Sequence, residues 1–487
     1  MKFRLVVRVL ALTSMVVSLC MAFPMIWAGI DGTEDLTAFA AAMTCGLSLG
    51  AACCALTGGK KADYERLGVR EAFVVVGLSW VISGVIGALP YAFSGALPSF
   101  TDAFFEAVSG LTTTGATVFT DVEALPRGLL FWRSMTHWMG GMGIVVLSLA
   151  VLPFLGVGGI ELYKAEVPGP TPEKLTPRVQ QTALSLWGVY VLLTALQTIL
   201  LTFGGMSFFE AVTHAFGTIS TGGFSTRNAS IAAFGSPYIE WVVTFFMFAS
   251  GANFSLHFMI LTGFWRKALR DEEFRLYAAG FAGAAALIAA ILWLGGTFGA
   301  ERSLRAAAFQ VGSFMTTTGF ASENYTLWPH FSQFLLLLLA FAGGCAGSTS
   351  GGLKCVRLLV LLRSIEMEIR SFLHPRAVLR TKVNGTVVSV RAMRAVLAFF
   401  TLYVAVMLAA SLAVTALGGN RLDISTALSG IAASLTNLGS GLGKLGATDS
   451  YAWLPAAVKW VFCFCMLVGR LELYAILLLF HPRVWKR

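Results

Sequence analysis

Long apolar runs recur along the whole chain, and short polar segments separate them. Each run has about 20 residues, enough for a helix to cross about 30 Å of hydrocarbon. A bilayer requires every backbone polar group to be paired within its own element, so such runs form helices. The pattern therefore predicts an all-α polytopic membrane protein. The expected spans lie near residues 5–28, 36–57, 71–93, 128–157, 179–203, 237–264, 276–296, 331–353, 393–417 and 455–481.

Four shorter segments lie between pairs of these runs, and each is too short to cross a membrane. They cover residues 101–112, 207–219, 304–315 and 423–435. Turn-forming or acidic residues such as Pro98, Asp102 and Asp423 stand at their starts, as suits helix N-termini. Each segment runs into a glycine-containing loop: SGLTTTGAT, GTISTGGFS, SFMTTTGFA or SLTNLGSG. The order outer helix, half-helix, loop and inner helix therefore occurs four times.

The four loops align when they are anchored on Gly115, Gly223, Gly319 and Gly439. Every loop has a hydroxyl residue three positions before this glycine, a small polar residue two positions before it and alanine twelve positions before it. One such loop is an ordinary turn, but four in register indicate an internal repeat. The predicted units are a two-helix unit at 1–69 and pore repeats at 70–160, 161–270, 271–385 and 386–487.

The loops predict an ion pathway. Non-helical backbone at membrane depth is tolerated only where it is buried in protein or lines a water-filled path. Four loops around one axis place carbonyl oxygens in rings, which replace the hydration shell of potassium in channels. For any single loop, close packing of small residues between helices is the alternative. The candidate potassium-binding residues of this selectivity filter are Thr113, Thr114, Gly115, Thr221, Gly222, Gly223, Thr317, Thr318, Gly319, Asn437, Leu438 and Gly439.

A glycine-rich stretch, GGCAGSTSGG at residues 343–352, interrupts the third inner helix. It does not match the phosphate-binding pattern GxxxxGK[ST], and apolar spans flank it. Each glycine weakens a helix by about 1 kcal/mol relative to alanine, so we expect a flexible intramembrane loop; a passive packing kink is the alternative. Its candidate residues are Gly343, Gly344, Gly347, Ser348, Gly351 and Gly352.

Arg470 lies inside the last inner helix, in the sequence GRLE. Charged residues within membranes usually face the protein interior and mark ion paths. Below the filter, this guanidinium would repel potassium and form an electrostatic barrier beside the glycine-rich loop. The alternatives are a structural ion pair with Glu472 and snorkelling to the cytoplasmic face.

Composition and charge agree with a membrane protein. Hydrophobic residues make up 56% of the chain and charged residues 12%, and the mean hydropathy is +0.76. The net charge is +10, but 26 of the 35 Lys and Arg residues fall in segments on one side of the predicted membrane. This asymmetry orients the helices with both termini in the cytoplasm and does not indicate a nucleic-acid surface. Acids on the other side, among them Glu106, Glu210 and Asp423, would concentrate cations at the mouth or cap the half-helices.

Longer motifs extend over essentially the whole chain: LLFWRSMTHWMGGMGI, GIELYKAEVPGPTPEKLTPR, DEEFRLY, GGCAGSTSGGLK, TNLGSGLG and GRLELYAILLLFHPRVWKR. With the four loops, they resemble the Trk/Ktr/HKT superfamily of potassium transporters, specifically the bacterial Trk-type pore subunit. The resemblance implies a homodimer in the inner membrane that conducts potassium inward, with the glycine-rich loop as its gate. It also implies a TrkA-like nucleotide-binding ring as cytoplasmic partner, for which we expect the basic segments 164–178, 266–275 and 363–382 to be the docking surface. Ser440 departs from the proline that is common in the superfamily.

Two other functions remain open from the sequence. A proton- or sodium-coupled potassium symporter would need an ionisable residue beside the filter, and Arg470 alone is a poor candidate. A membrane-embedded enzyme would need a nucleophile and a base on facing helices, and no such signature is present, so we expect neither catalysis nor a bound cofactor. The favoured mechanism is uptake driven by the membrane potential, since 100 mV contributes about 2.3 kcal/mol per charge.

Overall fold

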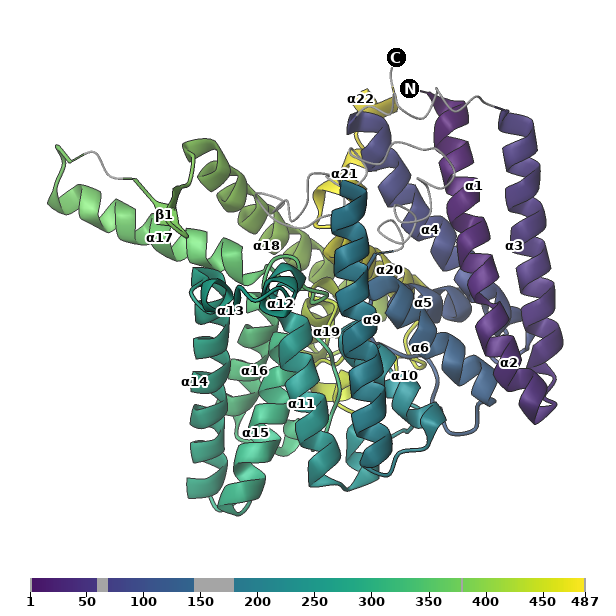
Figure 1. Ribbon diagram of the computed structural model, residues 1–487, viewed down its shortest axis with the longest axis horizontal. Helices are drawn as coiled ribbons and strands as arrows, with labels where there is room; N and C mark the ends of the chain where they lie inside the picture. Colours follow the sequence, from purple (N-terminus) through teal and green to yellow (C-terminus); the bar gives the residue numbers. More distant parts are fainter. Residues whose placement is uncertain (1, 59–68, 144–178, 378–379, 486–487) are drawn as a thin grey trace.

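The computed structural model describes residues 2–58, 69–143, 179–377 and 380–485 (Figure 1). The N-terminal unit contains α1 (Phe3–Cys20), α2 (Ala22–Asp31) and α3 (Asp35–Thr57). The first repeat contains α4 (Val69–Phe93), α5 (Phe100–Leu111) and α6 (Arg127–Gly141). The second contains α9 (Val179–Phe203), α10 (Phe208–Ile219), η2 (Ser230–Phe234), α11 (Pro237–Gly251), α12 (Phe254–Leu261) and α13 (Trp265–Ala268).

The second half of the chain repeats this order. The third repeat contains α14 (Glu272–Leu294), α15 (Ala300–Met315), η3 (Tyr325–Leu327), α16 (His330–Ala342), α17 (Cys355–Leu373), β1 (Lys382–Val383) and β2 (Thr386–Val387). The fourth contains α18 (Val390–Gly418), η4 (Gly419–Arg421), α19 (Ile424–Leu435), η5 (Gly443–Leu445), α20 (Ala456–Arg470), α21 (Tyr474–Leu479) and α22 (Pro482–Trp485).

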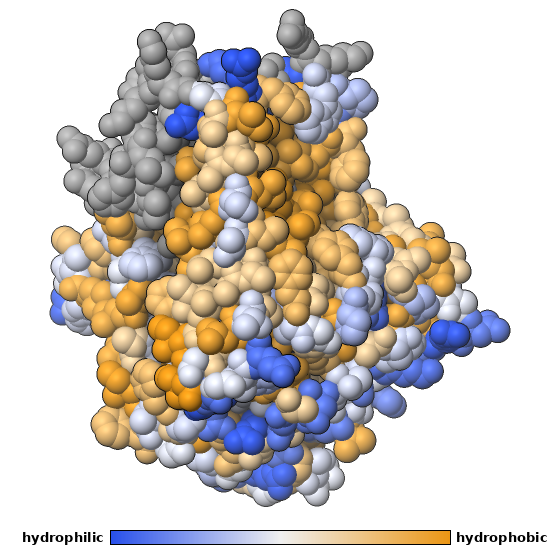
Figure 2. All heavy atoms as spheres, turned by 90° about the vertical axis from the view of Figure 1, so that its right-hand side faces the viewer, coloured by the Kyte–Doolittle hydropathy of each residue, from blue (hydrophilic) through white to orange (hydrophobic). Residues whose placement is uncertain are grey.

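The helices have the length and surface of membrane spans. Within the described residues, six helical segments are long and apolar enough to cross a membrane, and α11 with α12 is a further, bent candidate. Large apolar side chains on the outer helices face outward, such as Phe203 on α9 and Leu412 on α18. Apolar residues dominate the middle of the face seen in Figure 2. The prediction of a helical, multi-pass membrane protein is therefore confirmed.

The half-helices occupy the centre of the bundle. Each contacts the outer helix of its own repeat, as α5 contacts α4 and α19 contacts α18. Each also contacts an inner helix from a neighbouring repeat: α6 packs on α10, α11 on α15, α16 on α19, and α20 on α5. The contacts return to α5, so these inner helices and half-helices form a closed ring.

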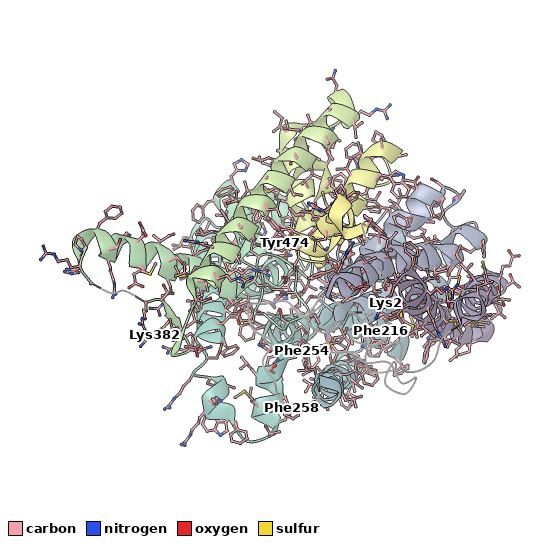
Figure 3. The ribbon with its side chains drawn as sticks, turned by 90° about the horizontal axis from the view of Figure 1, so that it is seen from above. Lys2, Phe216, Phe254, Phe258, Lys382 and Tyr474 are labelled. Carbon is pink, nitrogen blue, oxygen red and sulfur yellow. The ribbon has the colours of Figure 1, made fainter. Side chains whose placement is uncertain are left out.

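The periphery carries the remaining elements. In Figure 1, α17 and the β1–β2 hairpin project from the bundle, and the view from above places Lys382 of the hairpin far from the centre (Figure 3). The hairpin is antiparallel, with two residues in each strand, and is the one departure from all-α structure in the described residues. The two termini lie at the same end of the molecule (Figure 1).

The inner helices are more broken than the sequence indicated. The span expected at 237–264 consists of α11 and α12, which meet at 101°. Asn253 sits at the bend and caps α12 by accepting a hydrogen bond from the Ser255 N–H. The span expected at 455–481 ends as α20 and resumes as α21. Mean hydropathy does not locate such breaks, because each involves only one or two polar or charged residues within an apolar run: Asn253 at the first, Arg470 and Glu472 at the second. The later part of the span expected at 128–157 lies outside the described residues.

Candidate functional site

The hydroxyl residue three positions before each aligned glycine ends its half-helix. Thr112, Ser220, Thr316 and Thr436 are the C-cap residues of α5, α10, α15 and α19. In three of them the hydroxyl donates to the carbonyl four residues earlier, as in the 2.7 Å bond from Thr112 Oγ1 to Val108 O. In the fourth, Thr436 Oγ1 donates to Ala433 O at 3.3 Å. The repeated hydroxyl is thus explained by the need to end four helices at one place.

The loops that follow share one backbone conformation. The next residues, Thr113, Thr221, Thr317 and Asn437, have φ between 54° and 59°, which is uncommon for residues with a Cβ. The anchor glycines have φ between 82° and 85°, a region that favours glycine. Between them, the N–H of Thr114, Gly222, Thr318 or Leu438 donates to the carbonyl five residues earlier, at 2.7–2.9 Å.

The four glycines meet their neighbours in cyclic order. A Cβ built on any of them would overlap a backbone carbonyl oxygen of the next loop. The overlapping pairs are Gly115 with the carbonyl of Gly222, Gly223 with that of Thr318, Gly319 with that of Leu438, and Gly439 with that of Thr114. The contacts therefore return to their starting point, and the structure brings all twelve candidate filter residues together around one axis. Glycine is required here both by its φ and by this close approach.

A polar cavity of about 100 Å³ lies on the outer side of this ring. The four anchor glycines border it, together with backbone and hydroxyl groups of the loops that return to the inner helices. Two of these loops are linked beside the cavity: Asn228 Nδ2 donates to Asp121 Oδ1 at 2.8 Å, and its N–H donates to Glu123 Oε1 at 3.0 Å. The bond from Asn228 holds the pKa of Asp121 below its ordinary value.

A buried ion pair supports the first loop, and it corrects one sequence-based expectation. Glu106 was expected to face the outside, but its side chain is fully buried and pairs with Arg133 at 2.8 Å. Glu106 also accepts a 2.9 Å bond from the Val118 N–H, and Arg133 donates to Ser225 O of the second loop at 3.2 Å. A buried carboxylate requires such partners. The expectation of caps holds for Glu210, in a capping box with Ser207, and for Asp423, which caps α19.

The glycine-rich stretch forms a non-helical loop between α16 and α17, against the inner side of the ring. The Gly351 N–H donates to Thr317 Oγ1 at 2.7 Å, and the Gly352 N–H donates to Thr436 O at 3.1 Å. Thr349 Oγ1 donates to Ile219 O, at the end of α10, at 2.9 Å. The loop therefore touches the ends of three half-helices.

Arg470 connects this loop to the first repeat. Its guanidinium donates to Thr349 O at 2.7 Å, Gly140 O at 2.6 Å and Gly141 O at 3.0 Å. Glu472, the alternative partner considered from the sequence, forms an ion pair with Arg357 of α17. The positive charge of Arg470 therefore lies against backbone carbonyls on the inner side of the ring, next to the glycine-rich loop.

Two further charged residues hold the glycine-rich loop, and the sequence reasoning did not single them out. Glu273 of α14 is buried, and its Oε1 accepts hydrogen bonds from Ala346 N–H at 2.6 Å and Val356 N–H at 2.9 Å. Lys354 is buried and donates from Nζ to Ser350 O and, at 3.4 Å, to Ser348 O. The available signal was weak: Lys354 follows an apolar and glycine-rich stretch, where an unpaired charge is costly, but Glu273 lies among other charged residues at the start of its helix.

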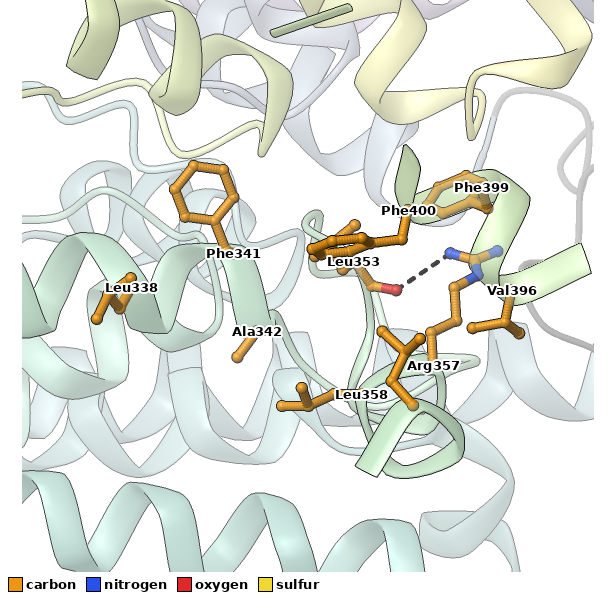
Figure 4. Close-up of a pocket in the computed structure, with 10 residues that line it drawn as sticks. Leu338, Phe341, Ala342, Leu353, Arg357, Leu358, Val396, Phe399 and Phe400 are labelled. Carbon is orange, nitrogen blue, oxygen red and sulfur yellow. Dashed lines mark hydrogen bonds between the residues drawn. The ribbon is translucent and has the colours of Figure 1, made fainter. Parts of the chain in front are cut away.

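An apolar cavity of about 200 Å³ borders the same loop (Figure 4). Leu338 and Phe341 of α16, Leu353 at the end of the loop, and Val396 and Phe400 of α18 are among its lining residues. Arg357 also lines it, donates to Leu353 O at 3.2 Å and stacks its guanidinium 4.1 Å from the ring centre of Phe399. The cavity thus lies beside Ala342 and Leu353, the two residues that flank the glycine-rich stretch.

Within the described ranges, no group of three or more His, Cys, Asp or Glu side chains is arranged to hold a metal ion. Oxygen ligands of another kind are concentrated at the ring, in backbone carbonyls and hydroxyls. Such neutral oxygens suit a monovalent cation in transit better than a tightly bound divalent ion. The arrangement defines a multi-pass helical membrane protein with four re-entrant loops around a central axis.

Comparison with known proteins agrees with this class. The family model described as TrkH, cation transport protein, matches residues 46–295 and 296–487. The chain therefore belongs to the TrkH family of cation transport proteins, a family of membrane transporters and not of enzymes.

Named relatives are similar over their full lengths. The chain is 40% identical to the Trk system potassium uptake protein TrkH of Salmonella typhimurium and to that of Escherichia coli. Both alignments cover 100% of this chain and 100% of the relative. It is 38% identical to the Trk system potassium uptake protein TrkG of Escherichia coli over 86% of each chain. It also resembles the crystal structure of the potassium transporter TrkH from Vibrio parahaemolyticus, with a TM-score of 0.89, 36% identity and 100% coverage of both chains.

Proposed function

We propose that this protein takes up potassium across the bacterial inner membrane through a gated, potassium-selective pore driven by the membrane potential. The observation that carries the proposal is the ring of four loops, in which each glycine abuts a carbonyl of the next loop. The names of the relatives, all potassium uptake proteins or a potassium transporter, support potassium as the transported ion.

The twelve ring residues are the selectivity filter in this proposal, and the predicted units at 70–160, 161–270, 271–385 and 386–487 are the four pore repeats. Carbonyl oxygens would replace the water around potassium as it passes. The half-helices support this role, because α5, α10, α15 and α19 all end at the ring and direct partial negative charge toward it.

The glycine-rich loop is the proposed gate. It lies against the inner side of the filter through Gly351 and Gly352, where it would obstruct a permeating ion. Arg470 would hold the loop in this position and oppose cations by its charge. The apolar cavity behind Leu353 supports mobility of the loop, because the loop has space into which it can move.

The proposed protein is the membrane subunit of a larger Trk-type system, as a homodimer with both termini cytoplasmic and a TrkA-like ring as partner. Two of the three predicted docking segments approach each other, since Arg363 lies 3.5 Å from Glu272. Asn384, just beyond the segment 363–382, also donates from Nδ2 to Asp271 at 2.7 Å. The third, 164–178, lies outside the described residues. Arg370 on this surface is exposed and forms an ion pair with Glu366, four residues earlier on the same helix.

The test is potential-driven rubidium and sodium uptake into liposomes that contain the purified protein, without a proton gradient. We expect rubidium uptake well above sodium uptake. A Gly115→Ser variant should lower this ratio about 5- to 150-fold, because strain and overlap of about 1–3 kcal/mol fall directly on the filter. Gly205→Ser is the matched control, since Gly205 also has positive φ but has no atom within 4 Å of its Cβ position.

The outcomes distinguish the proposed pore from the alternative functions. Uptake that requires a proton or sodium gradient would indicate the coupled symporter. Absence of flux of any monovalent cation would overturn the pore. Equal ratios in the two glycine variants would show that the ring at Gly115 does not select ions.

A further inference from the structure

The fourth filter loop lacks a support that the other three possess. Nine positions before the anchor glycine, a polar side chain of the half-helix bonds the chain just beyond its own loop. Glu106 accepts from Thr117 Oγ1 at 3.0 Å, His214 Nε2 pairs with Ser225 Oγ at 2.9 Å, and Gln310 Nε2 donates to Glu323 O at 3.3 Å. The equivalent residue of the fourth repeat is Gly430, which has no side chain, and its Cβ position is close to Leu445 and Phe462.

The fourth loop has other supports. Ser429, one residue earlier on α19, accepts a 3.0 Å bond from the Leu442 N–H beyond the loop, and two tyrosine hydroxyls bond the loop itself. Tyr451 donates to the carbonyl of the anchor glycine itself, Gly439, at 2.7 Å. Tyr325 donates to Gly441 O at 2.9 Å. Both side chains are about 1% exposed, and a buried phenol hydroxyl normally requires a partner of this kind.

These tyrosines also connect the fourth loop to its neighbours in the ring. Tyr325 comes from the third repeat, in η3, so its bond crosses from the third repeat to the fourth. The backbone N–H of Tyr451 donates to Thr117 O at 2.8 Å, which joins the fourth repeat to the exit of the first loop. Both side chains pack against aromatic rings. The ring centres of Tyr451 and Phe105 are 5.5 Å apart, and those of Tyr325 and Phe314 are 4.9 Å apart.

We propose that Tyr451 and Tyr325 are specificity-determining positioning residues for the filter. The inference rests on the proposed function of the ring. The bond from Tyr451 fixes the direction of the peptide after Gly439, and thereby the path of the loop whose Leu438 carbonyl abuts Gly319. Since selectivity depends on the number and placement of the carbonyl dipoles around the ion, a loosened fourth loop admits sodium more readily.

The experiment compares Tyr451→Phe and Tyr325→Phe with Tyr403→Phe in the liposome uptake assay. Tyr403 is the matched control, because it is equally buried and its hydroxyl has no hydrogen-bond partner among the residues described. We expect Tyr451→Phe to lower the rubidium-to-sodium ratio about threefold to tenfold, the effect of losing one neutral hydrogen bond. Tyr325→Phe should lower it at least about twofold, and Tyr403→Phe should leave it unchanged.

The ratio separates positioning from general damage, because a purely structural defect lowers both fluxes and the melting temperature together. A wild-type ratio in Tyr451→Phe would overturn the inference, as would an equal fall in Tyr403→Phe. If Tyr451→Phe does not fold, the ratio in Tyr325→Phe decides in the same way. Failure of the proposed function is distinct, since then the unmodified protein itself shows no selective uptake.

Discussion

Replacing Arg470 with alanine should raise the resting flux through the pore. The substitution removes three bonds from a charged donor to backbone carbonyls, of which the 2.7 Å bond to Thr349 O belongs to the proposed gate. A hydrogen bond to a charged group contributes about 1.5–3 kcal/mol. The closed arrangement therefore loses about 1.5–3 kcal/mol relative to an open one, which is about a 10- to 150-fold change in their ratio. Loss of the positive charge acts in the same direction.

The measurement is potential-driven rubidium uptake into liposomes without any nucleotide-binding partner. Starting from a closed resting gate, we expect uptake by Arg470→Ala to rise at least about tenfold. Arg470→Lys should fall between the two, because an ammonium keeps the charge but not the forked donor geometry. Unchanged uptake by Arg470→Ala, with normal expression and melting temperature, would refute the proposed barrier.

Three further changes test other parts of the structure. Glu273→Ala leaves two buried N–H groups without an acceptor, at about 1–3 kcal/mol each, so resting rubidium uptake should rise. Glu273→Gln keeps an acceptor and should change the uptake less. Equal uptake by the two variants would show that these bonds do not hold the loop. Gly351→Ala should also raise resting rubidium uptake, because its Cβ would overlap Thr436 O. Gly283→Ala is the control and should not raise it, since its Cβ position is in open space. A larger effect of Gly283→Ala would contradict the contact between the glycine-rich loop and the ring. Bonds from Ser425 and Thr426 lower the pKa of Asp423 from 3.8 to about 2, so its stabilising effect is present above about pH 4 and lost as the pH falls through 2. The melting-temperature difference between the wild type and Asp423→Asn should therefore shrink from pH 5 to pH 3, and a constant difference would refute this cause.

The sequence was sufficient to locate the helices and the loops at the ring. Repeated hydroxyl and glycine positions carry that information, because helix C-caps and close backbone approach each restrict the residue type. The half-helix expected at 101–112 is found as α5 at Phe100–Leu111, and that expected at 423–435 is found as α19 at Ile424–Leu435. The glycine-rich loop was visible for the same reason.

The supporting contacts could not be predicted from the sequence. Glu106 and Arg133 are 27 residues apart, and Glu273 bonds Ala346 across 73 residues, so their pairing depends on how separate helices and loops pack against one another. The bend at Asn253 and the break after Arg470 were missed because both lie within apolar runs. Periodicity reports which residues are buried, but it does not report which buried polar groups meet.

The contact between α20 and α5 has a consequence for biosynthesis. The ring closes only when the last inner helix reaches the first half-helix, so no subset of repeats contains a complete filter. At about 5–20 residues per second, α20 is made about 20–70 seconds after α5, since roughly 360 residues separate their ends. During that interval the first half-helix, whose buried Glu106 pairs with Arg133 of α6, stays in the membrane without its final neighbour. The early repeats must therefore persist as a partly assembled intermediate, and a chain truncated before α20 should be a substrate for membrane proteases.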